Sequence, residues 1–388
     1  MCRLPISLAA ALLLTIGCQS KQEKAIEAVE KLGGFCKTAN DRPGQPVVTV
    51  FLYNRQTTDK AMPVFESFPE LEVLDLQGAH ITDQGLKHLQ GLSHLKGLSL
   101  GNTAIGDEGL AYLEGLTQLQ RLDLSETKIS DEGLAHLQGL TEIRKLDLSH
   151  TQITGAGLAQ LKGLTNLAHL GLEGTQLSDN SLEALECFRE IIMLGMSDTQ
   201  VTDAGLKHLR NMSKLAELRL NSTSVSDAGL ENLKSLVGLK ILALSQTHVG
   251  DPGLAHLRDL SRLAFLLLNR TQVTDAGLSH LKGLKNLEYL ALQATPVEGA
   301  GIESLKNLPN LGRVDLSRSQ VSDVGLSHFR DLKNLRDLRL SHTKVSDHGL
   351  NHLEQLPKLV RLDVIQTAVS EAAIRKFRES HPRMLVNR

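Results

Sequence analysis

Aspartate and histidine side chains recur through the sequence at a fixed spacing, and they are the residues that could bind a metal or transfer protons. The aspartate fills ten of thirteen equivalent positions. Five residues after it, histidine recurs in seven copies: His88, His136, His208, His256, His280, His328 and His352. A zinc site needs several ligands within about 2.0–2.2 Å of one ion, whereas these histidines fall in successive copies. We therefore expect no metal site, and histidines that hydrogen-bond locally or to the next copy.

Other signs of catalysis or cofactor binding are also missing from the sequence. It contains no glycine-rich phosphate loop, no paired-cysteine motif and no nucleophile elbow. A motif that returns in nearly every copy is typical of a structural role. Basic and acidic residues number 42 and 44 and are interleaved, which gives no electrostatic footprint for nucleic acid. We predict a protein that is not an enzyme, has no cofactor and does not bind nucleic acid.

The element that positions these residues is a 24-residue repeat, present in thirteen copies from residue 71. A clean copy, residues 119–142, reads LQRLDLSETKISDEGLAHLQGLTE. Leu122 and Leu124 alternate with polar residues, as in a strand. Leu134 and Leu137 follow helical spacing and predict a short helix of about two to three turns. Each copy should therefore fold as strand, turn, helix and return loop.

Three polar or small positions in each copy have predictable structural roles. Thr127 follows the strand, and its hydroxyl could bond backbone groups in the turns of its own or the next copy. Asp131 opens the helix and is expected to accept hydrogen bonds from the free amides of a helix start. Gly133 permits close approach of the neighbouring copy. Strands stack about 4.8 Å apart and helices about 8–10 Å apart, so such a stack should bend.

The pattern LxxLxLxxTxIxDxGLxxL resembles leucine-rich repeats of the ribonuclease-inhibitor-like type, in the bacterial variant with Thr, and also those of F-box leucine-rich proteins. The resemblance covers residues 47–388. It implies an α/β solenoid, a curved horseshoe with a parallel β-sheet on the concave face and helices on the convex face. It implies a binding role without naming the ligand. Residues 19–46 are too short for an F-box, so a ubiquitin-ligase role does not carry over.

The N-terminus resembles a bacterial lipoprotein signal. Residues 1–17 hold Arg3 and an apolar run too short to span a bilayer, and they end in LTIG before Cys18. The resemblance implies lipidation of Cys18 and an exported, membrane-anchored lipoprotein of the cell envelope, at the outer membrane or cell surface. Thr15 stands where such signals usually carry Leu. The alternative is an ordinary signal peptide cleaved nearby.

Both ends of the array are expected to carry caps that cover the apolar ends of the stack. Residues 18–46 would hold the lipid anchor, a short linker and a cap helix over residues 21–32. Residues 47–70 form a degenerate first repeat, and the regular repeats continue to residue 370. Residues 371–388 form the C-terminal cap, with a helix and a last short strand at residues 384–386.

The repeat does not fix the residue type at the outward positions of the strands. Most copies place polar, charged or small residues there, but the middle copies place apolar ones. Contiguous exposed apolar surface marks interaction sites, and aromatic anchors dominate binding energy. The predicted partner site is Ile241, Phe265, Leu267 and Tyr289, with Arg219, Asn269, Arg270 and Arg313 as a polar rim.

Charged residues occupy the outward positions of the late strands. Arginine and aspartate alternate there in three successive copies: Arg313 with Asp315, Asp337 with Arg339, and Arg361 with Asp363. We interpret them as exposed pairs, worth about 0–1 kcal/mol each, in preference to a site for a charged ligand.

The leading hypothesis for function is a lipid-anchored scaffold that binds a protein or peptide on its concave face. The alternatives are a structural envelope protein without a dedicated ligand, and a binder of glycan or cell-wall material. A compact apolar patch favours a protein partner. Glycan binding would instead use aromatic platforms ringed by carboxamides and carboxylates, for which only Tyr289 with Gln293 and Glu288 provides a hint.

Overall fold

The structure, a computed structural model, describes residues 20–53, 56–381 and 384–388. It forms two compact units, Met1–Lys128 (unit 1) and Ile129–Arg388 (unit 2), each considered by itself. The expected signal segment and Cys18 lie outside the described residues. Among the helices that are described, none has the length and apolar character needed to cross a bilayer.

Unit 1 begins with a helix and a β-hairpin. Helix α1 (Lys21–Lys31) starts at a capping box formed by Ser20 and buries Ala25 and Val29, two members of its apolar stripe. Strand β1 (Phe35–Thr38) then pairs antiparallel with β2 (Val47–Phe51), with Phe35 opposite Phe51. The sequence of β1, FCKT, has no apolar run that would predict a strand. Its extended conformation is stabilised by pairing with β2.

Parallel strands follow in chain order, one to each copy. In unit 1 they are β3 (Val73–Asp75), β4 (Gly97–Ser99) and β5 (Arg121–Asp123). In unit 2 they are β6 (Lys145–Asp147), β7 (His169–Gly171), β8 (Met193–Gly195), β9 (Glu217–Arg219), β10 (Ile241–Ala243), β11 (Phe265–Leu267), β12 (Tyr289–Ala291), β13 (Arg313–Asp315), β14 (Asp337–Arg339), β15 (Arg361–Asp363) and β16 (Leu385–Asn387). The middle residue of each copy's strand is buried, so the outer two face the same side.

The predicted short helix is present in each copy, and its type is α-helical, 3₁₀ or a combination of the two. Across the described residues, six copies contain a four-residue α-helix that passes into a 3₁₀ turn, and five contain 3₁₀ helix alone. The α-helices are α2 (Asp83–Leu86), α3 (Asp107–Leu110), α4 (Asp227–Leu230), α5 (Asp251–Leu254), α6 (Asp275–Leu278), α7 (Asp323–Leu326), α8 (Asp347–Leu350) and the longer C-terminal α9 (Glu371–Ser380). The 3₁₀ helices are η1 (Asp59–Ser67), η2 (Lys87–Leu89), η3 (Ala111–Leu113), η4 (Gly133–Leu137), η5 (Ala156–Gly163), η6 (Asp179–Cys187), η7 (Gly205–Leu209), η8 (Glu231–Leu233), η9 (Ala255–Leu257), η10 (Ser279–Gly283), η11 (Ala300–Leu305) and η12 (Ser327–Phe329).

The spacing of the apolar residues explains the tighter helix. Leu134, Leu137 and Leu140 are three residues apart, which is the period of a 3₁₀ helix, and all three are fully buried. In an α-helix the first two of these leucines would also contact the residues four positions later, but these are the polar Gln138 and Thr141. The buried leucines of the helices and the buried leucines of the strands together form the continuous core of each unit.

The threonine after each strand closes the turn of its own copy. Thr271 Oγ1 donates a hydrogen bond to the carbonyl of Leu268 at 2.7 Å, and the same bond recurs in every copy that carries the threonine. The residue before it has a positive φ in most copies, such as 55° at Arg270. The hydroxyl therefore satisfies a carbonyl in a strained turn and does not reach the next copy.

The recurring aspartate joins one copy to the next, which corrects the prediction that it caps its own helix. Asp251 accepts hydrogen bonds from the Thr274 amide at 2.8 Å and the Thr274 hydroxyl at 2.6 Å. Asp203 binds Ser226 in the same way. Because neighbouring helices lie side by side, the carboxylate reaches the residue that starts the next helix. We call this set of contacts the aspartate ladder.

The recurring glycine makes room for the aspartate ladder. A Cβ at Gly205 would lie 2.5 Å from Oδ1 of Asp179, and a Cβ at Gly277 would overlap the carboxylate of Asp251. The predicted close approach is therefore confirmed, and its partner is the aspartate of the preceding copy.

One junction exchanges these two residue types. Gly155 occupies an aspartate position, and Ser181 occupies the matching glycine position. Ser181 Oγ donates to the Thr154 carbonyl at 3.0 Å and accepts from the Ser178 amide at 3.4 Å. A Cβ at Gly155 would overlap Ser181. The Ser181 hydroxyl therefore replaces the missing carboxylate. At this junction the glycine is at the aspartate position of the first copy, and the polar side chain is at the glycine position of the next.

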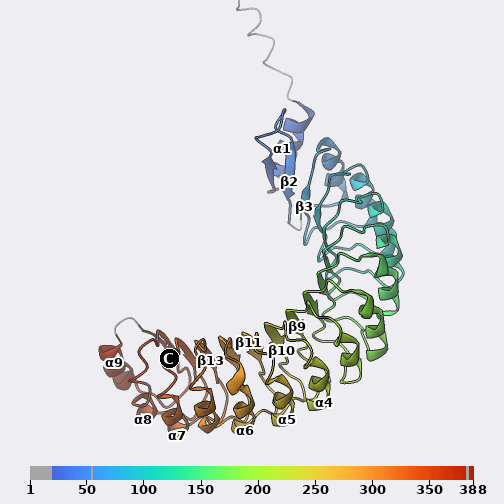
Figure 1. Ribbon diagram of the computed structural model, residues 1–388. Coiled ribbons are helices and arrows are strands. Elements are labelled where there is room, and N and C mark those ends of the chain that lie inside the picture. The colour runs from blue at the N-terminus through green and yellow to red at the C-terminus, as the bar shows by residue number, and fades with distance from the viewer. Residues whose placement is uncertain (1–19, 54–55, 382–383) are drawn as a thin grey trace, which may run out of the picture. The chain divides into compact units, whose positions relative to one another are not determined.

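Unit 2 has its strands on one face and its short helices on the other (Figure 1). The strand face is concave, and the helices line the convex side of the unit. The outward residues of β6–β16 therefore form a continuous surface to which each copy contributes two residues, one of them a glycine in β7 and in β8.

Candidate functional site

An aromatic pair lies at the centre of the strand face of unit 2. Phe265 on β11 is the register partner of Tyr289 on β12. Their ring centroids are 6.4 Å apart at an interplanar angle of 76°, an edge-to-face contact. Both side chains are half-buried. The pair therefore presents a fixed apolar surface whose rings are already packed before any ligand arrives.

Arg313 extends this surface on the next strand. Its guanidinium lies 5.3 Å from the centroid of the Tyr289 ring, within range of a cation–π contact. Its Nε lies 3.0 Å from Oδ2 of Asp337, which holds it in place. Burial raises the pKa of the Tyr289 hydroxyl, and the Asp315 carboxylate adds to the rise. The hydroxyl is therefore protonated at neutral pH and available as a hydrogen-bond donor.

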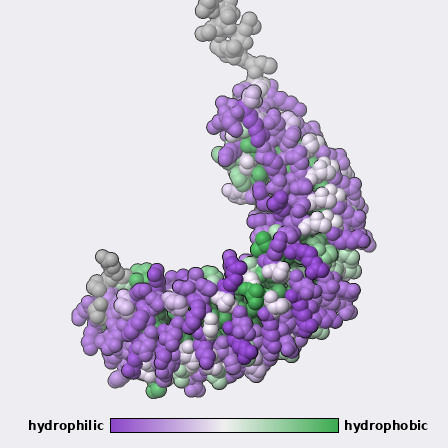
Figure 2. All heavy atoms as spheres, viewed as in Figure 1, coloured by the Kyte–Doolittle hydropathy of each residue, from purple (hydrophilic) through white to green (hydrophobic). Residues whose placement is uncertain are grey.

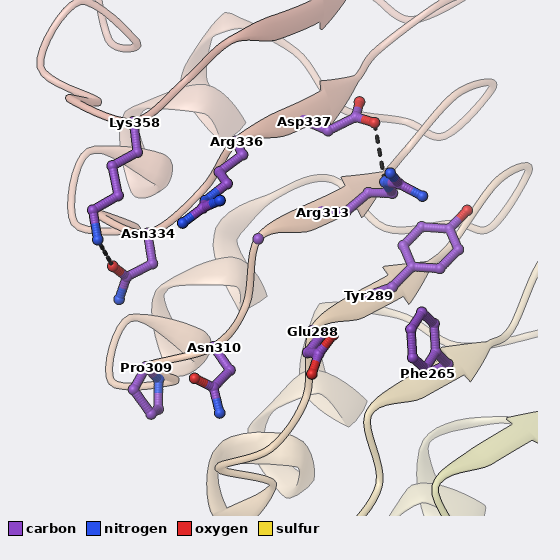
Figure 3. A pocket seen from close by; sticks show the side chains of 11 residues that line it. Phe265, Glu288, Tyr289, Pro309, Asn310, Arg313, Asn334, Arg336, Asp337 and Lys358 are labelled. Atoms are coloured by element: carbon purple, nitrogen blue, oxygen red, sulfur yellow. Dashed lines mark hydrogen bonds and ion pairs between the residues drawn. The ribbon is translucent and has the colours of Figure 1, made fainter.

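A pocket of about 510 Å³ opens beside the aromatic pair (Figure 3). Phe265, Glu288 and Tyr289 line one side, and Arg336 with Lys358 lines the other. Gly312 lies between them: its amide donates to the Glu288 carbonyl, and its own carbonyl accepts from the Arg336 amide. The absence of a side chain at Gly312 leaves the hollow. We call this the Gly312 pocket.

The charged residues of the late strands form a network with buried acids. Asp315, Asp337 and Asp363 are only 8%, 7% and 6% exposed, so the prediction of exposed pairs is wrong for the aspartates. Arg339 lies among them, 3.5 to 3.7 Å from a carboxylate oxygen of each. Burial lowers the pKa of Arg339, but these carboxylates outweigh it and raise the pKa above its usual value. The network fixes the strand face on the C-terminal side of the pocket.

The other predicted apolar residues lie on neighbouring strands. Ile241 on β10 pairs with Phe265, and Leu267 lies on the same strand as Phe265. Each of the four is half-buried, because neighbouring side chains cover part of each one. Figure 2 shows hydrophobic residues gathered on the strand side of unit 2, next to β9 and β10.

Three of the predicted rim residues lie outside the Gly312 pocket. Arg219 is held by Glu217 at 2.5 Å and by Glu173 at 3.6 Å. Asn269 accepts a hydrogen bond from the Gln293 amide at 2.9 Å and so bridges copies. Arg270 lies in the turn after β11, in a separate hollow. Of the predicted rim, only Arg313 lines the pocket with the aromatic pair.

At least three of the seven recurring histidines contact glutamates of the preceding copy. His88 Nδ1 lies 2.6 Å from Glu66 Oε1, and His208 Nδ1 lies 2.6 Å from Glu186 Oε1. His328 makes the same kind of contact with Glu303. Within the described ranges there is no group of three or more histidine, cysteine, aspartate or glutamate side chains that could hold a metal ion. These contacts lie between the helical segments of successive copies and link one copy to the next.

Sequence reasoning missed the residues that shape the pocket. Gly312, Arg336 and Lys358 precede the strands and lie outside the two outward strand positions of each copy. A comparison of the residue just before each strand would have found Gly312 and Arg336, whereas Lys358 lies further from its strand, before Val360. The position just before the strand holds Lys240, Ala264, Glu288, Gly312 and Arg336 in successive copies, so a glycine stands between opposite charges.

Comparison with known proteins supports the fold. The model of a leucine-rich repeat region matches residues 51–228. An internalin of Listeria monocytogenes superposes with a TM-score of 0.67 and 22% identity, over 94% of this chain and 94% of that chain. A leucine-rich-repeat protein of Leptospira interrogans gives a TM-score of 0.61 and 18% identity, over 84% of this chain and 92% of that chain. No curated protein matches the sequence. The chain thus has the leucine-rich-repeat solenoid fold that its repeat predicts.

Proposed function

We propose that the chain is a non-enzymatic scaffold that binds a partner protein on the strand face of unit 2. The observation that carries this proposal is the aromatic pair of Phe265 and Tyr289, which breaks the polar pattern of the repeat next to the Gly312 pocket. Solenoid repeats commonly use their concave surfaces for binding. Rigid aromatic anchors contribute much of the energy of such interfaces.

In this proposal the protein is exported and held at a membrane of the cell envelope by a lipid on Cys18. The support comes from the sequence: an apolar run of signal-peptide length ends directly before Cys18. Helix α1 starts three residues after Cys18, so the capped array would begin close to the membrane surface.

The glycan alternative is less well supported by the geometry of Tyr289. Sugar stacking needs a free aromatic face, but the Arg313 guanidinium lies over one face of this ring and the Phe265 ring packs against it in an edge-to-face contact. A purely structural envelope role gives no reason for an open pocket beside two aromatic rings.

The test is a pull-down from the native envelope with the Phe265→Glu, Tyr289→Glu double variant. We expect loss of a partner that the unaltered chain recovers, because two carboxylates would stand in the apolar contact. The matched control is Val237→Glu, Val324→Glu, which changes the charge equally at valines that are 56% and 76% exposed elsewhere in unit 2. Equal recovery by both variants, each folded by circular dichroism, would overturn the proposal.

A further inference from the structure

The Gly312 pocket is not required by the fold. A Cβ at Gly312 would meet only the Asn310 carbonyl oxygen at 3.7 Å and the Asn334 carbonyl oxygen at 4.0 Å, which are ordinary contacts. No backbone strain calls for glycine here, because the residue is not among those with positive φ. This differs from glycines such as Gly277, where a side chain would overlap the aspartate ladder. The hollow is therefore a local feature that the stacking of copies does not explain.

Of the three cationic side chains around the hollow, one forms an ion pair and two do not, among the residues that the structure describes. Arg313 is paired with Asp337. Across the hollow, Arg336 and Lys358 are both exposed, and Lys358 Nζ donates to the neutral Asn334 side chain at 2.7 Å. Within the part of the chain that the structure describes, neither cation forms an ion pair. The side of the pocket away from the rings therefore offers two cations to a negatively charged group (Figure 3).

The opposite side of the hollow carries the rings and a carboxylate. Glu288 lies next to Tyr289, two strands from Arg336, a separation of roughly 10 Å at the usual strand spacing. A negative group placed against the rings would be repelled by Glu288. Glu288 and Asp337 together also make the pocket a poor fit for a polyanion such as nucleic acid, because like charges would be brought together.

We propose that the Gly312 pocket receives a partner segment in which an acidic side chain lies within about three residues of an aromatic or large aliphatic one. The apolar side chain packs over Gly312 against Phe265 and Tyr289, and the carboxylate lies between Arg336 and Lys358. This inference rests on the proposed function and names the chemistry of its partner. The separation across the hollow matches about three residues of extended peptide, so one short segment fills it.

The test uses 12-residue random peptides displayed on phage and selected on the immobilised full-length chain. Selected peptides are then synthesised, and their dissociation constants are measured by fluorescence anisotropy. We expect enrichment of Asp or Glu within three residues of Phe, Tyr, Trp or Leu. The Arg336→Glu, Lys358→Glu variant should bind these peptides roughly tenfold or more weakly, because both attractive charges become repulsive.

Two further variants separate charge from shape. Lys207→Glu, Lys282→Glu makes the same change in charge at exposed lysines outside the pocket and should leave binding within about twofold. Gly312→Leu fills the hollow without backbone strain and should abolish binding. If Gly312→Leu unfolds the chain, the charge variants still decide the question.

The contradicting outcomes are distinct from those for the proposed function. Peptides that are neutral or basic, yet lose binding in the Phe265→Glu, Tyr289→Glu variant, would overturn the acidic preference and leave the proposed function standing. Equal binding by the two charge variants would do the same. If no peptide is selected, this inference fails, while the pull-down judges the proposed function independently.

Discussion

Replacing Asp251 by alanine is expected to lower the free energy of unfolding by about 2–4 kcal/mol. The carboxylate accepts two hydrogen bonds from Thr274, one from its amide at 2.8 Å and one from its hydroxyl at 2.6 Å. Hydrogen bonds to a charged group contribute more than neutral ones, and the alanine variant leaves the Thr274 amide without its acceptor. Because the bond joins two copies, its loss weakens an interface between repeats.

Urea unfolding followed by circular dichroism measures this effect. The matched control is Asp259→Ala, which removes an aspartate whose side chain is 76% exposed and pairs with the exposed Arg258 of its own copy at 3.4 Å. The control should change stability by less than about 0.5 kcal/mol. Equal losses in both variants would show that the aspartate ladder contributes nothing beyond an ordinary surface aspartate.

Placing aspartate at Gly155 is expected to cost about 2–5 kcal/mol, although aspartate is the usual residue at this position. Gly155 has a φ of 99°, which residues with side chains rarely adopt, and a Cβ there would overlap Ser181. The residue that the repeat favours is therefore the wrong one at this junction.

The double variant Gly155→Asp, Ser181→Gly should recover most of that loss, because it restores the aspartate–glycine pair of the other copies. Ser181→Gly alone should cost about 1 kcal/mol, since it removes the hydrogen bond to the Thr154 carbonyl. A double-mutant cycle from the four unfolding curves gives the coupling. Additive effects, within about 0.5 kcal/mol, would contradict the exchange inferred here.

Much of the fold could be predicted because the repeat determines it at each copy. Leu122 and Leu124 alternate with polar residues, and the strand lies where that alternation places it. The same parity identified Phe265 and Tyr289 as residues of the strand face. The 3₁₀ turns agree with apolar residues that are three apart, such as the leucines of residues 134–140, but the prediction of a short helix did not distinguish 3₁₀ from α-helix.

The partners of the polar residues could not be predicted in the same way. The sequence shows that Asp251 recurs, but its partner Thr274 is 23 residues away and becomes a neighbour only when helices stack. The buried state of Asp315 depends likewise on Arg339 from the next copy. The Gly312 pocket was missed because its lining comes from four successive copies, and Gly312, Arg336 and Lys358 lie outside the strands.

The most direct test of the proposed binding face is photo-crosslinking from within it. A benzophenone amino acid is placed at Tyr289, and in a second protein at Ala276, an exposed residue of α6 on the helix side. Both proteins are produced in the native host and irradiated in intact cells. We expect a discrete adduct with a partner protein from position 289 and none from position 276. The same adduct from both positions, or an adduct from position 276 alone, would contradict the proposed binding face.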